Sequence, residues 1–168
     1  KEKKFSLKDV FLKSLAPDGG LFIPKEVIPY KAEELNDLKN LSYNQLAVKI
    51  IYKFCEEEFQ EKEIKEIVEA SYKNFRTQDV VKINKIGKLN LLELFHGPTL
   101  AFKDIAMQVI GNMYESLLKK NKLKINIVVA TSGDTGAAAI NAIKDRSNMK
   151  IFVLHPENKI SDVQRKFM

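Results

Sequence analysis

The sequence is poor in the residues on which several classes of site depend. Its 168 residues include one cysteine, two histidines and no tryptophan. The single cysteine, Cys55, excludes an intramolecular disulfide and a cysteine-rich metal site, and it fits a protein of the reducing cytoplasm. His96 and His155 are isolated from each other and do not form the cluster that a metal ion needs. We therefore expect no metal site and a cytoplasmic location.

Long apolar runs are also missing. The uninterrupted apolar runs are short, such as residues 127–130, whereas a helix that spans a bilayer needs about 20 apolar residues. The first ten residues, KEKKFSLKDV, are basic but lack the apolar region and cleavage site of a secretory signal. We therefore expect no membrane segment and no secretory signal.

Arginine is scarce although the chain is basic, with a formal net charge of +6. Arg76, Arg146 and Arg165 are the arginines, and the other basic residues are lysines scattered among glutamates. Bidentate contacts to phosphates and bases favour arginine, and no nucleic-acid-binding motif is visible. We therefore expect a lysine-rich, solvated surface that attracts small anions, and no nucleic-acid partner.

Hydrophobic spacing predicts a helical region over residues 1–78. Ser6 is expected to cap a first helix, which ends before the Pro17–Gly20 cluster, and Ser42 is expected to cap a later one. A further helix is predicted over residues 61–75. Between the first two helices, the prolines of LFIPKEVIPY predict an irregular, extended segment.

After residue 78, short apolar segments alternate with helical patterns. A strand-like segment is expected at 80–84, separated by a turn at 85–88 that contains Gly87 from a second one at 89–94. Further strands are expected at 125–130 and 151–156, and a helix is expected after each of the segments 89–94, 125–130 and 151–156. Strands that alternate with helices through short connections are typical of a parallel sheet. The predicted fold class is therefore α/β, with an α-rich region over 1–78 followed by the first βα units of a parallel-sheet domain over 79–168.

The segment FHGPTLAFKD, residues 95–104, places Lys103 just inside the start of a predicted long helix. Unpaired N–H groups and the positive end of the helix dipole disfavour an ammonium there by up to ~1 kcal/mol. The neutral amine is the nucleophilic form, although Asp104 beside it acts in the opposite direction. An exposed helix lysine without function remains the more common interpretation of such a residue alone.

The segment TSGDTG, residues 131–136, follows a predicted strand and begins a helix. Its glycines permit a close backbone approach, and Ser132, Thr135 and the backbone N–H groups could bind a carboxylate or phosphate. An ordinary turn capped by Ser132 or Asp134 explains the pattern equally well. In a parallel sheet this turn and Lys103 would reach the same edge, as a pyridoxal phosphate enzyme acting on an amino acid requires.

Three segments, SLAPDGGLFIP, FHGPTLAFKD and ATSGDTGAAA, occur in this order and together resemble the threonine synthase family of the tryptophan-synthase-β-like pyridoxal phosphate enzymes. The resemblance implies that Lys103 binds pyridoxal phosphate as a Schiff base and shuttles protons. It also implies that Ser132, Gly133, Asp134 and Thr135 hold the substrate carboxylate, with Asp134 and Thr135 at the cofactor as well. The implied reaction converts O-phospho-L-homoserine and water to L-threonine and phosphate.

Two departures from the family pattern accompany this resemblance. Related enzymes often have Asn at the place of Asp134, and an ionised Asp cannot donate a hydrogen bond to the cofactor's phenolic oxygen. The family's S-G-N-F-G-type loop for the cofactor phosphate is absent, so we expect the N-terminal part of a longer protein. A pyridoxal phosphate-dependent serine or threonine dehydratase and a non-catalytic paralogue remain alternatives, but SGDTG in place of SGNTG and the HGPTLAFKD context favour the synthase.

Overall fold

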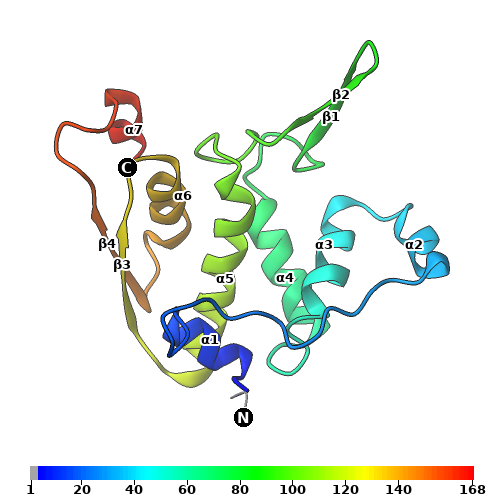
Figure 1. The fold of residues 1–168 in the computed structure, drawn as a ribbon, viewed down its shortest axis with the longest axis horizontal. Coiled ribbons are helices and arrows are strands. Elements are labelled where there is room, and N and C mark those ends of the chain that lie inside the picture. The colour runs from blue at the N-terminus through cyan, green and yellow to red at the C-terminus, as the bar shows by residue number, and fades with distance from the viewer. Residues whose placement is uncertain (1–3) are drawn as a thin grey trace. The chain divides into compact units, whose positions relative to one another are not determined.

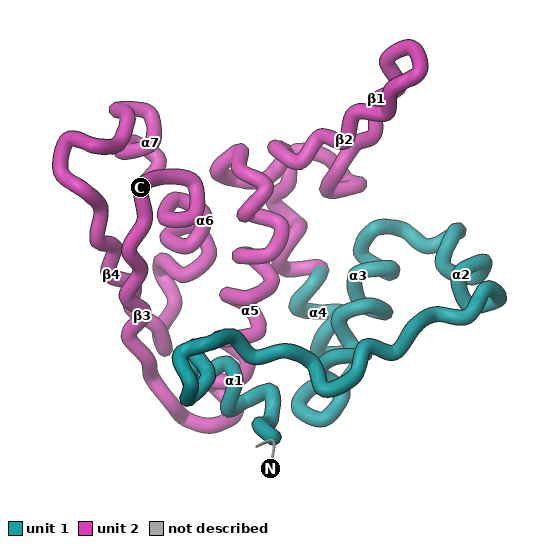
Figure 2. Tube along the Cα trace, in the orientation of Figure 1, with its two compact units in different colours: residues 1–68 teal, residues 69–168 magenta. Residues whose placement is uncertain are grey.

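The structure, a computed structural model, describes residues 4–168 and divides into two compact units. Unit 1 comprises residues 1–68 and unit 2 comprises residues 69–168 (Figure 2). The division lies within helix α4 (Glu61–Tyr72). The sequence-based boundary near residue 78 lies inside unit 2, and the assignment of domains to 1–78 and 79–168 stays a prediction.

Unit 1 is helical, as predicted. Its elements are α1 (Leu7–Lys13), α2 (Ala32–Leu38), α3 (Tyr43–Tyr52) and the first part of α4. The Ser6 hydroxyl accepts a hydrogen bond from the Asp9 N–H at 3.1 Å, and the Ser42 hydroxyl accepts one from Gln45 at 3.3 Å. Each serine thereby satisfies an N–H that its helix leaves unpaired, so both predicted caps are confirmed.

The core of unit 1 contains the single cysteine. Its buried apolar side chains come from α3, α4 and the link between them: Val48, Cys55, Phe59, Ile64, Ile67 and Val68. The Cys55 thiol donates to the Ile51 carbonyl at 3.2 Å. Burial, followed by repulsion from Glu56, raises its pKa to about 11, so the protonated, unreactive form prevails near neutral pH.

The segment between α1 and α2 is irregular, as its prolines predict. It begins with a tight turn in which the Gly19 N–H donates to the Ala16 carbonyl at 2.9 Å, and Gly19 has a φ of +83° that suits glycine. The side chains of Leu21 and Ile23 are 79% and 84% exposed. These two residues therefore add little buried area to unit 1.

Unit 2 contains a parallel pair of strands joined by a helical crossover. The elements of unit 2 after α4 are β1 (Lys82–Ile86), β2 (Leu89–Glu93), α5 (Lys103–Asn121), β3 (Ile125–Ala130), α6 (Asp134–Ile143), β4 (Met149–Leu154) and α7 (Asp162–Phe167). Strands β3 and β4 pair in parallel, with Ile125 opposite Met149 and Ala130 opposite Leu154. The predicted βαβ arrangement is confirmed for these two strands.

Strand β2 differs from the prediction, which placed it first in the parallel sheet. It pairs instead with β1 in an antiparallel hairpin that extends as a narrow arm (Figure 1), with Ile86 opposite Leu89. Gly87 and Lys88 connect the strands directly, and the φ of +59° at Gly87 suits a tight hairpin turn. Because so short a link allows only antiparallel pairing, the placement of β2 in the parallel sheet was wrong.

Helix α6 packs between α5 and the β3–β4 sheet (Figure 1). A cluster of buried side chains joins the three elements: Leu118 from α5, Ala142 and Ile143 from α6, and Met149 from β4. A Cβ atom at Gly111 of α5 would lie 2.7 Å from the Ala142 carbonyl oxygen. Glycine at this position therefore allows the two helices to approach closely.

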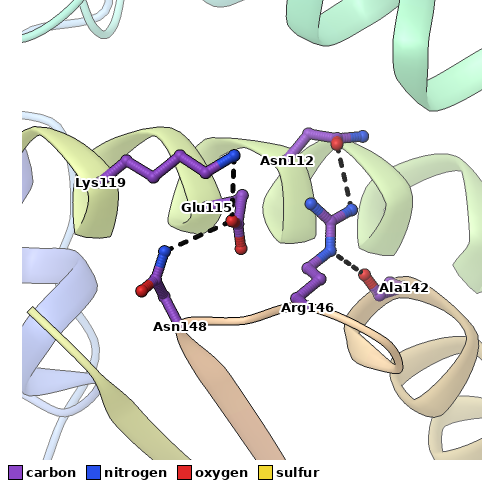
Figure 3. A network of polar contacts seen from close by, with 6 residues as sticks. All are labelled: Asn112, Glu115, Lys119, Ala142, Arg146 and Asn148. Atoms are coloured by element: carbon purple, nitrogen blue, oxygen red, sulfur yellow. Dashed lines mark hydrogen bonds and ion pairs between the residues drawn. The ribbon is translucent and has the colours of Figure 1, made fainter.

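A polar network fixes α5 against the end of α6 (Figure 3). Arg146 donates through Nε to the Ala142 carbonyl at 2.7 Å and through its guanidinium to Asn112 Oδ1 at 3.0 Å. Asn148 donates to Glu115 Oε1 at 3.4 Å. Burial lowers the pKa of Arg146, and Glu115 opposes that shift. The network thus joins the middle of α5 to the C-terminal end of α6.

Candidate active site

The turn before α5 holds a strained backbone. The Leu100 N–H donates to the Gly97 carbonyl at 3.2 Å, and Leu100 itself has a left-handed φ of +64°. This conformation costs roughly 1–2 kcal/mol for a residue with a side chain. Helix α5 then begins at Lys103, as predicted.

A buried carboxylate closes this turn. The side chain of Asp104 is 0% exposed and accepts two hydrogen bonds from Thr99, from the backbone N–H at 2.8 Å and from Oγ1 at 2.7 Å. Hydrogen bonds to a charged group stabilise by about 1.5–3 kcal/mol, and the first turn of a helix favours negative charge. These contributions are large enough to offset the strain at Leu100. A Cβ atom at Gly97 would overlap the Asp104 side chain, so the turn also needs glycine there.

The amine of Lys103 has no carboxylate partner among the described residues. Its side chain is half-buried, and Nζ lies 4.7 Å from the centroid of the Phe102 ring, within the range of a cation–π contact. The sequence suggested that Asp104 would counteract the effect of the helix start on the amine. In the structure the Asp104 carboxylate accepts its hydrogen bonds from Thr99.

The turn between β3 and α6 has no side chain that caps the helix, whereas a buried side chain closes the turn before α5. Gly133 occupies the N-cap position of α6 and no side chain caps the helix, so the interpretation of a turn capped by Ser132 or Asp134 was wrong. The side chains of these two residues are exposed. The Gly133 N–H donates to Thr131 Oγ1 at 3.4 Å, and the Gly136 N–H donates to the Gly133 carbonyl at 2.9 Å.

Two backbone N–H groups at the start of α6 have no acceptor within the helix. The N–H groups of Asp134 and Thr135 have no partner within α6, because the first turn of any helix lacks acceptors for them. A Cβ atom at Gly136 would lie 2.5 Å from Thr131 Cγ2 and 2.8 Å from Met168 Sδ, so the backbone is packed closely here. Such a helix start can bind a carboxylate or phosphate.

The two turns line one pocket of about 200 Å³. Its lining residues come from the turn before α5, from the start of α6 and from α7: Thr99, Leu100, Ala101, Gly133, Asp134, Ala137, Val163, Gln164 and Phe167. The pocket brings residues 99–101, from the segment FHGPTLAFKD, next to Gly133 and Asp134, and the predicted meeting of Lys103 with the TSGDTG turn stays a prediction. Lys103, Ser132 and Thr135 lie beside lining residues in the chain, but they are not part of the wall.

Sequence reasoning missed the contribution of α7. A Cβ atom at Gly133 would overlap the side-chain amide of Gln164, so the Gln164 side chain lies directly against the turn between β3 and α6. The side-chain oxygen Oε1 of Gln164 also accepts a hydrogen bond from the Ser161 N–H at 3.2 Å. A helix of six residues carries no ligand-binding motif, so only its position after β4 could have indicated this role.

The two histidines have different surroundings. His96 Nε2 lies 2.8 Å from Glu93 Oε2, and the His96 carbonyl accepts the Arg76 N–H at 2.8 Å, so this residue orders the base of the hairpin. His155 is exposed. Residues 4–168 contain no group of three or more potential metal ligands. Within the same range, no helix is long and apolar enough to cross a membrane.

Comparison with known sequences gives a consistent result along the chain. The family model described as "Threonine synthase N terminus" matches residues 1–72. Threonine synthase from Pseudomonas aeruginosa is 39% identical over 164 residues, covering 97% of this chain and 35% of that relative. The Saccharomyces cerevisiae enzyme is 38% identical over 181 residues, covering 99% of this chain and 35% of that relative.

Solved structures of threonine synthases also match this chain. The crystal structure of threonine synthase from yeast matches with a TM-score of 0.92 at 38% identity, covering 100% of this chain and 36% of that chain. The chain matches the N-terminal part of threonine synthases. A structure of pyridoxal phosphate-bound threonine synthase from Brucella melitensis gives a TM-score of 0.91 at 39% identity, covering 97% and 35%.

These matches confirm the resemblance to the threonine synthase family and the α/β fold of its N-terminal part. The chain spans about 35% of the length of the threonine synthases it matches. A protein named "Threonine synthase-like 2" from Mus musculus is also similar, at 36% identity over 151 residues, covering 89% of this chain and 31% of that relative.

Proposed function

We propose that the protein carrying this chain is a threonine synthase, a pyridoxal phosphate-dependent lyase of threonine biosynthesis. It converts O-phospho-L-homoserine and water to L-threonine and phosphate. The observation that carries the proposal is a pocket lined both by the turn before Lys103 and by the start of α6. The similarity to threonine synthases over 97% of the chain supports the specific reaction.

The residues of this chain fit one side of a pyridoxal phosphate site. Lys103 offers a half-buried amine without a carboxylate partner among residues 4–168. The start of α6 offers backbone donors in a closely packed, glycine-containing turn. Pyridoxal phosphate, when bound, supplies the electron-withdrawing group that this class of amino-acid chemistry needs.

Each predicted site residue has a distinct role in this proposal. Lys103 would hold the cofactor covalently through Nζ, and the same amine, once released from that bond, would move protons at the substrate carbon atoms. The Ser132 hydroxyl and the N–H groups of Asp134 and Thr135 bind the substrate carboxylate, with Gly133 permitting the close approach. Asp134 and Thr135 also contact the cofactor.

The remaining ligands are assigned outside this chain. No glycine-rich turn other than TSGDTG begins a helix in residues 4–168, and the chain spans 35% of the length of its Pseudomonas aeruginosa relative. We infer that the cofactor phosphate is bound by a part of the protein that this chain does not include. A small-molecule substrate, a cytoplasmic location and the absence of nucleic-acid and membrane partners complete the proposal. The scarcity of cysteine and arginine supports the last two points.

The proposal is tested by substrate choice in the full-length protein. We expect release of phosphate from O-phospho-L-homoserine with an equal amount of threonine formed, and no such release by the Lys103→Ala variant. Formation of a keto acid from serine or threonine would instead identify a dehydratase. Cofactor binding without turnover of any of these substrates would identify a non-catalytic paralogue.

A further inference from the structure

We propose that Asp104 and Thr99 form a latch that positions the amine of Lys103 for catalysis. The inference rests on the proposed function, because it concerns the lysine that would hold the cofactor. Asp104 is a positioning residue and not a catalytic one, since its carboxylate bonds Thr99 through the N–H at 2.8 Å and Oγ1 at 2.7 Å.

The start of α5 lacks the usual means of fixing a helix end. Phe102 occupies the N-cap position and makes no side-chain cap. The fixed point is instead the carboxylate of Asp104, which reaches back to Thr99 across the residues between them. The residue directly before this carboxylate is Lys103, so the latch determines where the first turn of the helix begins and hence where the amine stands.

The same two hydrogen bonds also shape the pocket. Thr99 and Leu100 belong to its wall, and Leu100 has a left-handed φ of +64°. A residue with a side chain keeps such a conformation only where its surroundings enforce it. Loss of the latch therefore releases the pocket wall and the lysine together, although no atom of Asp104 lines the pocket.

The test uses the full-length protein loaded with pyridoxal phosphate. Asp104→Asn weakens both hydrogen bonds, and Thr99→Val removes the one from the hydroxyl. Thr99→Ser keeps both bonds and serves as the rescue variant. Asn112→Ala is the matched control, because Asn112 lies on the same helix and its partly buried side chain donates hydrogen bonds away from this turn, to Ser71 Oγ at 2.9 Å and the Gln108 carbonyl at 3.0 Å.

We expect Asp104→Asn and Thr99→Val each to lower kcat about tenfold, because small misplacements of a reacting group have large kinetic effects. KM should change less than kcat, and the pH dependence of cofactor attachment to Lys103 should shift. The double variant should have a kcat no lower than that of the less active single variant, because the two residues take part in one interaction. Thr99→Ser should resemble the unmodified protein, and Asn112→Ala should lose stability without the kinetic change.

Unchanged kcat and an unchanged pH dependence of cofactor attachment in both latch variants would overturn the proposal, as would equal losses in Asn112→Ala. If Asp104→Asn fails to fold, the Thr99→Val and Thr99→Ser pair decides by the same criteria. If the unmodified protein takes no cofactor on Lys103, the proposed function fails. Amide hydrogen exchange at residues 97–102 then decides on the latch: faster exchange in Thr99→Val than in Asn112→Ala supports it, and equal exchange rejects it.

Discussion

The two turns that meet in the pocket are built in opposite ways. The turn before α5 is closed by side chains, because a fully buried carboxylate from Asp104 bonds both the backbone and the hydroxyl of Thr99. The turn before α6 has no side-chain cap, and the side chains of Ser132 and Asp134 are exposed. The turn before α5 uses its polar side chains for internal hydrogen bonds, while the turn before α6 leaves those of Ser132 and Asp134 exposed.

This difference matches what each turn must do in the proposed enzyme. A lysine that holds a cofactor has to stand in one place, which a strained backbone fixed by buried hydrogen bonds provides. A cradle for a carboxylate has to present unpaired donors, which a helix start without a cap provides. The comparison can be tested by changing one residue of each turn and measuring different properties.

The largest effect is expected at the lysine of the closed turn. Lys103→Ala in the full-length protein should lower kcat for phosphate release by about a thousandfold or more, because it removes the covalent attachment and the proton carrier. Lys119→Ala is the matched control, since Lys119 lies on the same helix and makes an exposed ion pair with Glu115 at 3.2 Å. Comparable losses in both variants would remove Lys103 from the site.

A second expectation concerns the glycines of the two turns. A Cβ atom at Gly97 would overlap the buried Asp104 side chain, whereas one at Gly133 would meet the mobile end of Gln164. We expect Gly97→Ala to lower the free energy of unfolding by about 1–3 kcal/mol, as overpacking does. Gly133→Ala should cost less than about 1 kcal/mol, because a flexible side chain can move aside. Urea unfolding of both variants measures the difference, and the reverse order would contradict the account of the closed turn.

The smallest effect is expected at the open turn. Ser132→Ala should raise KM for O-phospho-L-homoserine about fivefold, because it removes one hydrogen bond of about 1 kcal/mol to the carboxylate. Its kcat and its thermal stability should stay close to those of the unmodified protein. Ser147→Ala, a change at an exposed position after α6, is the control. A large loss of stability in Ser132→Ala would show that this hydroxyl has a structural role instead.

Much of the fold could be predicted from apolar spacing. In α5 the predicted inward residues Val109, Met113 and Leu117 are buried, because residues four apart lie on one face of a helix. The apolar spacing also placed Ala106 and Ile110 on that face, but Ala106 is exposed and Ile110 is 37% exposed. Strand β2 was assigned to the wrong sheet because its apolar residues lie on both faces, so its pattern does not specify a partner.

The site could be predicted in its motifs but not in its contacts. FHGPTLAFKD and TSGDTG indicated the two turns that line the pocket. The bond between Thr99 and Asp104 has no local signature, because their spacing of five residues is not that of a capping box. It depends on the left-handed conformation of Leu100, which the sequence alone does not reveal.

The most direct test of the account is to locate the covalent cofactor. Full-length protein incubated with pyridoxal phosphate is reduced with borohydride, digested and mapped by mass spectrometry. The account predicts a single reduced adduct on Lys103, at the start of α5 and beside the shared pocket. A specific adduct on any other lysine would contradict it.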